Sequence, residues 1–408
     1  MRYHSFYVNL ILLLSSIVLS NKIYFPSLNG IRFIAAFVVM ISHTFPLVQD
    51  FGFDTSFIMP DLGGLGVTLF FVLSGFLITF LLFTEKQQTH KIKTGSFIVR
   101  RILRIWPAYF LALGIGFFIF PYLDAHTHEF TQTYPWLKLG LFALFLGDFV
   151  KAIIFDAGVI NHLWSVGVEE QFYLIWPFLM NWFSSKFLKM AIIIIVINIL
   201  LRLGFAQWSN FHPLTEFNKT SWMICEAISK FFVWFRVDCM AIGGLGAYFI
   251  IEKKVRVLSF LYQKSIQITS YILLFLLLCF GITFGFITHD IYGILFLILI
   301  LNVSSNTSSV LNLEFSWLNR LGSISYGLYL YHPFIYFLIY YFYKQGWGTG
   351  SSILDLILFY SIFISGTILF SWLSYHYYES YFLRIKQKFT IIPSGDDAHE
   401  LISETNKE

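Results

Sequence analysis

Long apolar runs separated by short polar loops dominate the pattern along this chain. Ten of these runs are candidate membrane-crossing helices, and we expect them at roughly 30–49, 62–83, 105–121, 168–185, 187–206, 230–251, 267–286, 290–305, 322–343 and 352–377. An eleventh run, near 136–155, is interrupted by two glycines, an aspartate and a lysine. The predicted fold class is all-α: a polytopic integral membrane helical bundle with about ten transmembrane spans plus a re-entrant or interfacial segment.

Loop charge predicts how these spans are oriented. The loop at 84–104 is rich in Lys and Arg and should face the cytoplasm, whereas the loop at 50–61 has three aspartates and no basic residue and should face outward. Counting 136–155 as a full span would place the basic residues at 253–256 outside. Treating it as re-entrant keeps them inside, so we favour ten spans with both chain ends cytoplasmic.

The two ends differ from the membrane domain predicted for residues 24–384. Residues 1–23 form an N-terminal hydrophobic segment whose core resembles a signal peptide. Cleavage would leave Lys22 on the wrong side, so an extra or peripheral helix, or a misassigned start, fits as well. Residues 385–408 are expected to form a polar cytoplasmic tail.

Composition supports a membrane protein and excludes several other classes. The chain of 408 residues is 57% apolar and 12% charged, with a mean hydropathy of +0.71, whereas soluble domains carry about 25% charged residues. The net charge of +4 resides in particular loops, so nucleic acid is not an expected partner. Three dispersed cysteines are too few for a disulfide framework, and no metal site is expected.

Two ionisable residues, Arg32 and His43, lie in the first apolar segment. Eleven residues of α-helix place them on one face, about 16 Å apart along the axis, so one should lie toward each side of the membrane. Ionisable groups within a membrane are costly and therefore suggest a functional site. The alternative is that each packs between helices and binds a neighbouring carboxylate.

Two further clusters follow in the next segments. In Phe70–Gly75 the glycine permits close helix approach and Ser74 can hydrogen-bond across the interface, a pattern more often due to packing alone. Arg100, Arg101 and Arg104 are neighbours on one helix surface, and guanidinium groups bind phosphate oxygens bidentately. The alternative for the arginines is a patch that only sets membrane orientation.

A fourth cluster contains adjacent carboxylates, Glu169 and Glu170, at the outward end of an apolar helix. The helix dipole favours carboxylates at such an end, which explains at least one of them without any function. Either carboxylate could orient an imidazole and stabilise its charged form, as in many hydrolases and transferases.

Taken together, these clusters resemble, in order and spacing, the membrane acyltransferase 3 family, which includes O-antigen, exopolysaccharide and peptidoglycan O-acetyltransferases. The similarity extends from about residue 24 to 384. The matching motifs are R-x10-H at Arg32 and His43, FFxxSG at Phe70–Gly75, RxxR at Arg101 and Arg104, and WSLxxExxFY at Trp164, Ser165, Glu169, Phe172 and Tyr173, with Val166 in place of Leu. By this alignment Glu169, rather than Glu170, takes the functional position.

Later stretches at 235–238, 325–333 and 378–379 are also similar to the family, which often has Asp where Asn29 stands and Pro where Ser380 stands. Within them, Arg236 and Asp238 are expected to satisfy each other or a neighbouring span. His332 is expected to be a hydrogen-bonded core histidine that could also line an acceptor cavity.

The resemblance implies an O-acyltransferase with several spans in the inner (cytoplasmic) membrane. It would move an acyl group, expected to be acetyl, from acyl-CoA to a hydroxyl of a cell-surface or exported glycan. No bound cofactor is expected. The expected partners are acetyl-CoA or another acyl-CoA, a glycan or lipid-linked glycan, and the lipid bilayer. Because some relatives carry a fused extracytoplasmic domain that completes transfer, a separate extracytoplasmic transferase is a further candidate partner.

The resemblance also predicts roles for individual residues. His43 acts as a general base, and Glu169 orients it and stabilises its imidazolium form. Arg100, Arg101 and Arg104 hold the CoA phosphates, and Arg32 steadies the donor. Ser74 is the candidate oxyanion donor, and supporting positions are Gly75, Trp164, Ser165 and Tyr173.

The alternative function is a proton-coupled membrane transporter or flippase, with Arg32, His43, Glu169 and Asp238 as a proton relay. The sequence lacks a visible inverted repeat, which disfavours this alternative. An inactive scaffold is disfavoured because the matching motif residues are all present.

Overall fold

The computed structural model describes residues 23–55, 61–122, 134–153, 158–211, 219–349 and 351–392. Every element of secondary structure in these ranges is a helix, which confirms the predicted all-α class. The predicted N-terminal hydrophobic segment lies almost wholly outside the described residues. The predicted tail lies outside them from residue 393 onward.

The described residues contain fewer candidate membrane spans than the sequence predicted. Seven are long and apolar enough to cross a membrane, or up to 8 if a pair bent by 59° forms one span. The seven are Leu28–Asp50, Leu62–Thr89, Thr94–Tyr122, Gly158–Phe205, Glu226–Ile251, Gly285–Ser305 and Ser352–Gln387, and the bent pair is α13 (Val255–Leu261) with α14 (Lys264–Cys279). The predicted count of about ten is not confirmed.

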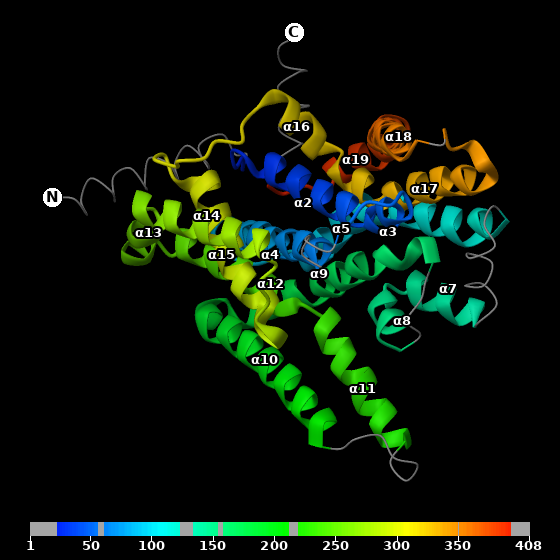
Figure 1. Cartoon of the computed structure of the whole chain (residues 1–408). Helices are drawn as coiled ribbons and strands as arrows, with labels where there is room; N and C mark the ends of the chain where they lie inside the picture. Colours follow the sequence, from blue (N-terminus) through cyan, green and yellow to red (C-terminus); the bar gives the residue numbers. More distant parts are fainter. Residues whose placement is uncertain are drawn as a thin grey trace, which may run out of the picture.

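Two features account for the difference that remains when the bent pair is counted as one span. The run Gly158–Phe205 is 48 residues long, about 72 Å as a continuous helix, and it contains α9 (Trp164–Phe183) and most of α10 (Phe187–Phe211). These helices, predicted as two spans, run in different directions in Figure 1. The second feature is α17 (Ser325–Phe342), whose tyrosines, histidine and proline make it too polar to be counted.

The interrupted run near 136–155 forms two short helices, α7 (Pro135–Ala143) and α8 (Gly147–Ile153). The chain turns between them at Phe145, which has a positive φ of 60°. Neither helix is among the candidate spans. This agrees with a re-entrant or interfacial segment rather than a full crossing.

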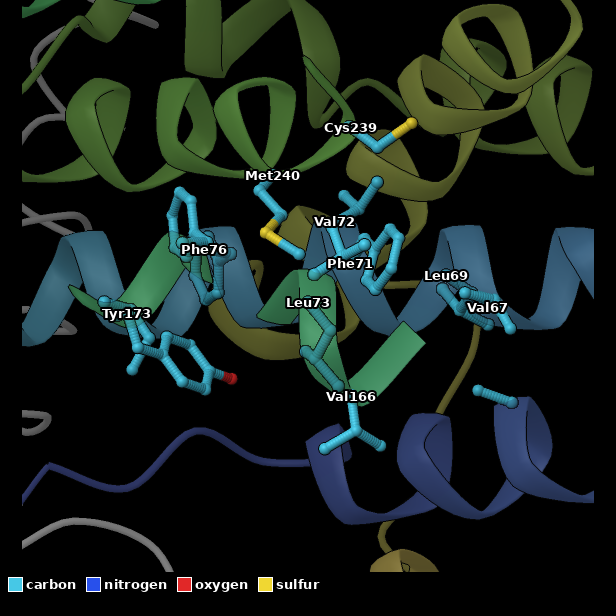
Figure 2. Close-up of a cluster of buried hydrophobic side chains, with 14 of the residues drawn as sticks. Val67, Leu69, Phe71, Val72, Leu73, Phe76, Val166, Tyr173, Cys239 and Met240 are labelled. Atoms are coloured by element: carbon cyan, nitrogen blue, oxygen red, sulfur yellow. The ribbon is translucent and has the colours of Figure 1, made fainter. Parts of the chain in front are cut away.

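The centre of the bundle is α4 (Leu62–Thr89), which α12 (Val237–Ile251) crosses at close range. A Cβ on Gly75 would lie 1.9 Å from the carbonyl oxygen of Met240, and a Cβ on Gly243 would lie 1.9 Å from that of Val72. Figure 2 shows Val72 of α4 beside Met240 in this crossing. The prediction that Gly75 permits close helix approach is therefore confirmed.

Around this crossing lie α2 (Leu28–Ser42), which packs on α4, and the remaining elements (Figure 1). These are α3 (Phe45–Asp50), α5 (Thr94–Gly114), η1 (Ile115–Ile119), η2 (Phe120–Tyr122), η3 (Gly158–Leu163), η4 (Ser184–Lys186), α11 (Lys219–Trp234), η5 (Gly285–Ile287), α15 (Thr288–Ser305), α16 (Ser316–Ser323), η6 (Tyr343–Trp347), α18 (Ser352–Leu373), η7 (Ser374–Glu379) and α19 (Ser380–Gln387).

A buried ionic cluster connects α10, α12 and α15. Arg202 forms an ion pair with Asp238 and a second one with Asp290 at 2.8 Å. Arg236 donates from Nη1 to the carbonyl oxygen of Gly64 at 3.0 Å. Arg236 and Asp238 are thus each bonded to other helices, which was one of the two arrangements expected of them.

Candidate active site

Two cavities lie on either side of a thin partition in the bundle. The first, of about 120 Å³, contains three arginines and is called the arginine cavity. Its polar lining residues are Arg32, Ser74, Arg101, Arg104, Ser165, Glu169, Tyr173, Ser325, Tyr326 and Tyr329. The second, of about 550 Å³, is called the histidine cavity. Its polar and aromatic lining residues are Ser42, His43, Asp61, Lys151, Asn161, His162, Trp164, Trp234, Tyr329, Tyr336 and Phe337.

Arg32 and His43 line different cavities although both belong to the α2 segment. Arg32 lies in the first turns of the helix, whereas His43 directly follows its last residue. The helical spacing had predicted opposite ends for the two side chains, and this separation is confirmed. Arg32 also donates from Nη1 to Oδ1 of Asn29 at 2.8 Å, so the residue that departs from the family pattern contacts the motif arginine.

Arg101 and Arg104 enter the arginine cavity from α5, because residues three apart share a helix face. The guanidinium of Arg101 lies 5.6 Å from the ring centroid of Tyr173, within the range of a cation–π contact. Its Nε is buried and has no hydrogen-bond partner among the described residues. A buried unpaired guanidinium nitrogen is costly and suits a site that receives an anionic ligand.

Arg100, which was predicted to act with Arg101 and Arg104, is not among the residues that line the arginine cavity. Its Nη2 forms an ion pair with Oε2 of Glu85 at 3.2 Å, and its Nη1 donates to the carbonyl oxygen of Phe389 at 2.9 Å. It lines a small neighbouring cavity of about 20 Å³, together with Arg101 and Lys386. Adjacent residues of a helix point about 100° apart, so Arg100 points away from the arginine cavity, toward Glu85 and Phe389.

Glu169 is held inside the arginine cavity by two hydroxyl groups. Its Oε1 accepts hydrogen bonds from Ser74 and, at 2.9 Å, from the hydroxyl of Tyr173. The Tyr173 hydroxyl also donates to Ser74 Oγ at 3.1 Å. Ser74 and Tyr173 therefore belong to the same hydrogen-bonded group as Glu169.

The predicted pairing of Glu169 with His43 is not the arrangement in the structure. At the start of α9 Trp164 lines the histidine cavity, whereas Ser165 and Glu169, one turn apart, line the arginine cavity. Glu169 is thus on the other side of the partition from His43. Glu170 is buried and accepts a hydrogen bond from Nε1 of Trp106 at 2.9 Å, so of the two carboxylates it is Glu169 that lines the arginine cavity.

His43 is bonded to a second histidine instead. Its Nδ1 lies 2.8 Å from Nε2 of His332, and the two rings are stacked with centroids 5.0 Å apart. His43 is exposed to the cavity, whereas His332 is fully buried behind it. A third histidine, His162, has its ring centroid 5.5 Å from that of His332.

The histidine cavity also contains charged groups that sequence reasoning did not assign to the site. Lys151 of α8 places its ammonium 3.9 Å from the ring centroid of Trp234 and 5.0 Å from that of Trp164. Burial, with a smaller effect from Arg236, lowers the pKa of Lys151 to about 8. Asp61 directly precedes α4, and its Oδ2 lies 3.1 Å from Nε2 of His289. In the sequence, the feature that could have indicated this role of Lys151 is its charge within an interrupted apolar run.

Comparison with known proteins identifies the chain's relationship. The sequence model of the acyltransferase 3 family, described as an acyltransferase domain, matches residues 25–376. The chain belongs to this acyltransferase family. The resemblance inferred from the motifs is thereby confirmed.

Three relatives of this acyltransferase illustrate the similarity. It is 27% identical over 342 residues to the peptidoglycan O-acetyltransferase OatA of Listeria monocytogenes, a match that covers 76% of this chain and 49% of the relative. It is 29% identical over 181 residues to the O-acetyltransferase OatA of Staphylococcus aureus, covering 40% and 26%. An uncharacterized protein of Haemophilus influenzae is 32% identical over 139 residues, covering 32% and 55%. The chain thus spans about half the length, or less, of these relatives, and no solved structure matches it.

The partition between the cavities is the part of this acyltransferase where their linings meet. Val67 and Tyr329 line both cavities. The Tyr329 hydroxyl is bonded to Ser165 Oγ at 2.6 Å and donates to the carbonyl oxygen of His162 at 2.8 Å. A single layer of side chains from α4, α9 and α17 therefore separates the two cavities.

Proposed function

We propose that this acyltransferase is an integral membrane O-acetyltransferase that moves acetyl from acyl-CoA to a hydroxyl of a cell-envelope glycan. The observation that carries the proposal is the pair of cavities, one with three arginines and one with an exposed histidine, joined at Tyr329. The names of the Listeria and Staphylococcus relatives support acetyl as the group and peptidoglycan as one acceptor class. The loop charges favour the orientation described above, in which the loop rich in Lys and Arg faces the cytoplasm.

The arginine cavity is the proposed donor site. Arg32, Arg101 and Arg104 present guanidinium groups that suit the phosphates of a nucleotide-derived donor. At about 120 Å³ the cavity is smaller than sites that enclose a drug-sized ligand. It therefore suits the thioester end of acyl-CoA. A neighbouring cavity of about 70 Å³, which shares these arginines and adds Lys386, extends the cationic surface for the phosphates.

The histidine cavity is the proposed acceptor site. Its volume of about 550 Å³ lies within the range of ordinary small-molecule sites. Trp164 and Trp234 contribute aromatic surface to the lining, and Asp61, Asn161 and Lys151 offer polar partners for the hydroxyls of a sugar. This combination favours a glycan over a purely apolar acceptor.

The proposed chemistry is acyl transfer with His43 as general base. His43 takes the proton of the acceptor hydroxyl while the oxygen attacks the thioester carbonyl carbon. The carbon–sulfur bond then breaks, and the proton held by His43 passes to the departing thiolate of CoA. The acetyl end of the donor must pass Tyr329 for this, because His43 lines only the histidine cavity of the two.

Glu169 has a different proposed role from the one expected. It holds the hydroxyls of Ser74 and Tyr173 and faces the cationic lining of the donor site. We assign it to the ordering of that site, where its negative charge balances part of the arginine charge, rather than to the orientation of His43.

The test compares the envelope glycans of a deletion strain that carries the wild type, His43→Ala or Glu169→Ala. Mass spectrometry should detect acetyl additions with the wild type and none with His43→Ala. Normal glycan acetylation by both variants at normal protein levels would refute the proposal. Purified wild-type protein in lipid should also consume acetyl-CoA without any ion gradient, which a proton-coupled transporter would not do.

The structure offers no specific support for the transporter. Its proton relay would include Asp238, but this carboxylate is fully buried in the ion pair with Arg202 and lines neither of the two cavities. We therefore advance the acyltransferase alone.

A further inference from the structure

The hydrogen bonds of His332 determine which of its ring nitrogens carries the proton. Its Nδ1 lies 2.8 Å from the carbonyl oxygen of Tyr329 and 3.2 Å from that of Leu328. Carbonyl oxygens only accept hydrogen bonds, so Nδ1 of His332 must be the donor and must carry hydrogen. The other nitrogen of His332, Nε2, has no such carbonyl acceptor among its described contacts and instead faces Nδ1 of His43.

The sequence explains why the Tyr329 carbonyl is open to this side chain. In an α-helix that carbonyl would accept the N–H of residue 333, but Pro333 has no N–H. A backbone acceptor buried without a donor is costly. The neighbouring His332 ring supplies the missing donor, so the His-Pro pair fixes the ring's orientation and its protonated nitrogen together.

The protonation of His332 in turn fixes that of His43. A neutral imidazole with hydrogen on Nδ1 has an unprotonated Nε2, which can only accept. At 2.8 Å the donor must be Nδ1–H of His43. A doubly protonated His332 would be a charge buried at 0% exposure, and its described polar partners are two carbonyls and a histidine. Such an unpaired buried charge is strongly disfavoured.

We propose that His332 is a positioning residue that holds His43 in the tautomer with hydrogen on Nδ1 and a free electron pair on Nε2. The base role that this tautomer serves rests on the proposed function. The free Nε2 is then the only ring atom of His43 able to accept the hydroxyl proton. When it does so, the positively charged ring strengthens its Nδ1–H bond to His332, and the transferred proton is stabilised without any carboxylate.

Two variants of similar size separate this role from packing. Gln at position 332 can place its amide oxygen near the position of Nε2 and accept from His43. Met fills similar space and offers only a weakly accepting sulfur. We expect H332Q to keep activity within about tenfold of the wild type, and H332M to lose about 10²- to 10³-fold in kcat, within the range that general-base catalysis contributes. KM for acetyl-CoA should be unchanged in both, because His332 does not line the donor cavity.

A spectroscopic measurement tests the tautomer without reference to activity. Nitrogen-15 NMR of histidine-labelled wild-type protein in lipid, with His43 assigned by its loss in His43→Gln, should show a protonated Nδ1 and an unprotonated Nε2. In H332M this single tautomer should give way to a mixture. A protonated Nε2 on His43 of the wild type, or equal kcat values for H332M and H332Q, would overturn the proposal.

The two readouts also separate this inference from the proposed function. Wild-type protein that transfers no acetyl but shows the predicted tautomer would refute the function and leave the positioning role intact. Active wild-type protein with the opposite tautomer would refute the positioning role alone. A failure of H332M to fold leaves the wild-type spectrum as the deciding measurement.

Discussion

Tyr329 of α17 and Ser165 of α9 are joined through their hydroxyl oxygens, 2.6 Å apart, where the arginine and histidine cavities meet. The same tyrosine bonds the carbonyl oxygen of His162 at 2.8 Å. These two bonds hold the side chain that lines both cavities. The partition thus depends on a polar contact between helices that are far apart in the sequence.

Removal of the Tyr329 hydroxyl should loosen the partition. Tyr329→Phe keeps the ring but loses both bonds, each worth about 1 kcal/mol, so water from the histidine cavity should reach the donor more often. We expect the ratio of acetyl-CoA hydrolysis to acetyl transfer to rise. Thiol release and glycan acetylation, measured side by side, give this ratio. Tyr336→Phe, in the histidine cavity but outside the partition, is the matched control and should leave the ratio unchanged.

The two adjacent arginines of α5 should differ in their effect on donor binding. Arg101→Gln removes a charge from the arginine cavity, and the loss of a charged hydrogen bond should raise KM for acetyl-CoA about 10- to 100-fold. Arg100→Gln removes a charge already paired with Glu85 and should change KM less than about threefold. Steady-state kinetics of both purified variants provide the comparison. Equal effects would mean that the cavity boundaries do not define the donor site.

The lowered pKa of Lys151 predicts a pH-dependent contribution to stability. Its pKa is about 8 in the folded protein and 10.5 in an ordinary environment. Between these values the unfolded chain binds more protons than the folded one, so this group makes folding more favourable as pH rises from about 8 to 10.5. Below pH 8 its destabilising effect is constant.

Lys151→Met should therefore be most stable, relative to the wild type, below pH 8. The difference in unfolding midpoint between the two proteins should shrink as pH rises toward 10.5. Thermal unfolding in detergent across this range measures it. A difference that is independent of pH would show that Lys151 titrates normally.

The glycine crossing of α4 and α12 should be intolerant of a single methyl group. In Gly75→Ala the new Cβ would lie 1.9 Å from a backbone oxygen, so the two helices must separate. Such overpacking costs about 1–3 kcal/mol. Gly95→Ala is the control, because a Cβ there meets nothing within 4 Å. Unfolding midpoints in detergent should fall for the first variant and stay or rise for the second.

The sequence predicted best what depends on a single helix. Helical spacing alone separated Arg32 from His43, and the family pattern selected Glu169, which lines the arginine cavity, over the adjacent Glu170. The span count of about ten is not confirmed, because the sequence prediction separates α9 from α10 and includes α17, whereas in the structure α9 and α10 fall in one apolar run and the tyrosine-rich α17 is not among the candidate spans.

Contacts between distant helices could not be predicted. The partner of His43 is 289 positions away in the chain, and the bond depends on how α17 packs against α2. The expectation that a carboxylate must serve the histidine favoured Glu169, which the start of α9 instead directs to the other cavity. Sequence spacing contains no information on which side of such a partition a residue falls.

The thinness of the partition has a consequence for the permeability barrier. Under the proposed function, neither the nucleotide nor the sugar has to leave its own compartment, because a single layer of side chains, with Tyr329 and Val67 lining both cavities, separates their binding sites. Only a group of two carbons would cross, and the thioester's own free energy of transfer would drive it. The enzyme could then modify material on the far side of a sealed membrane without opening a pore and without drawing on an ion gradient.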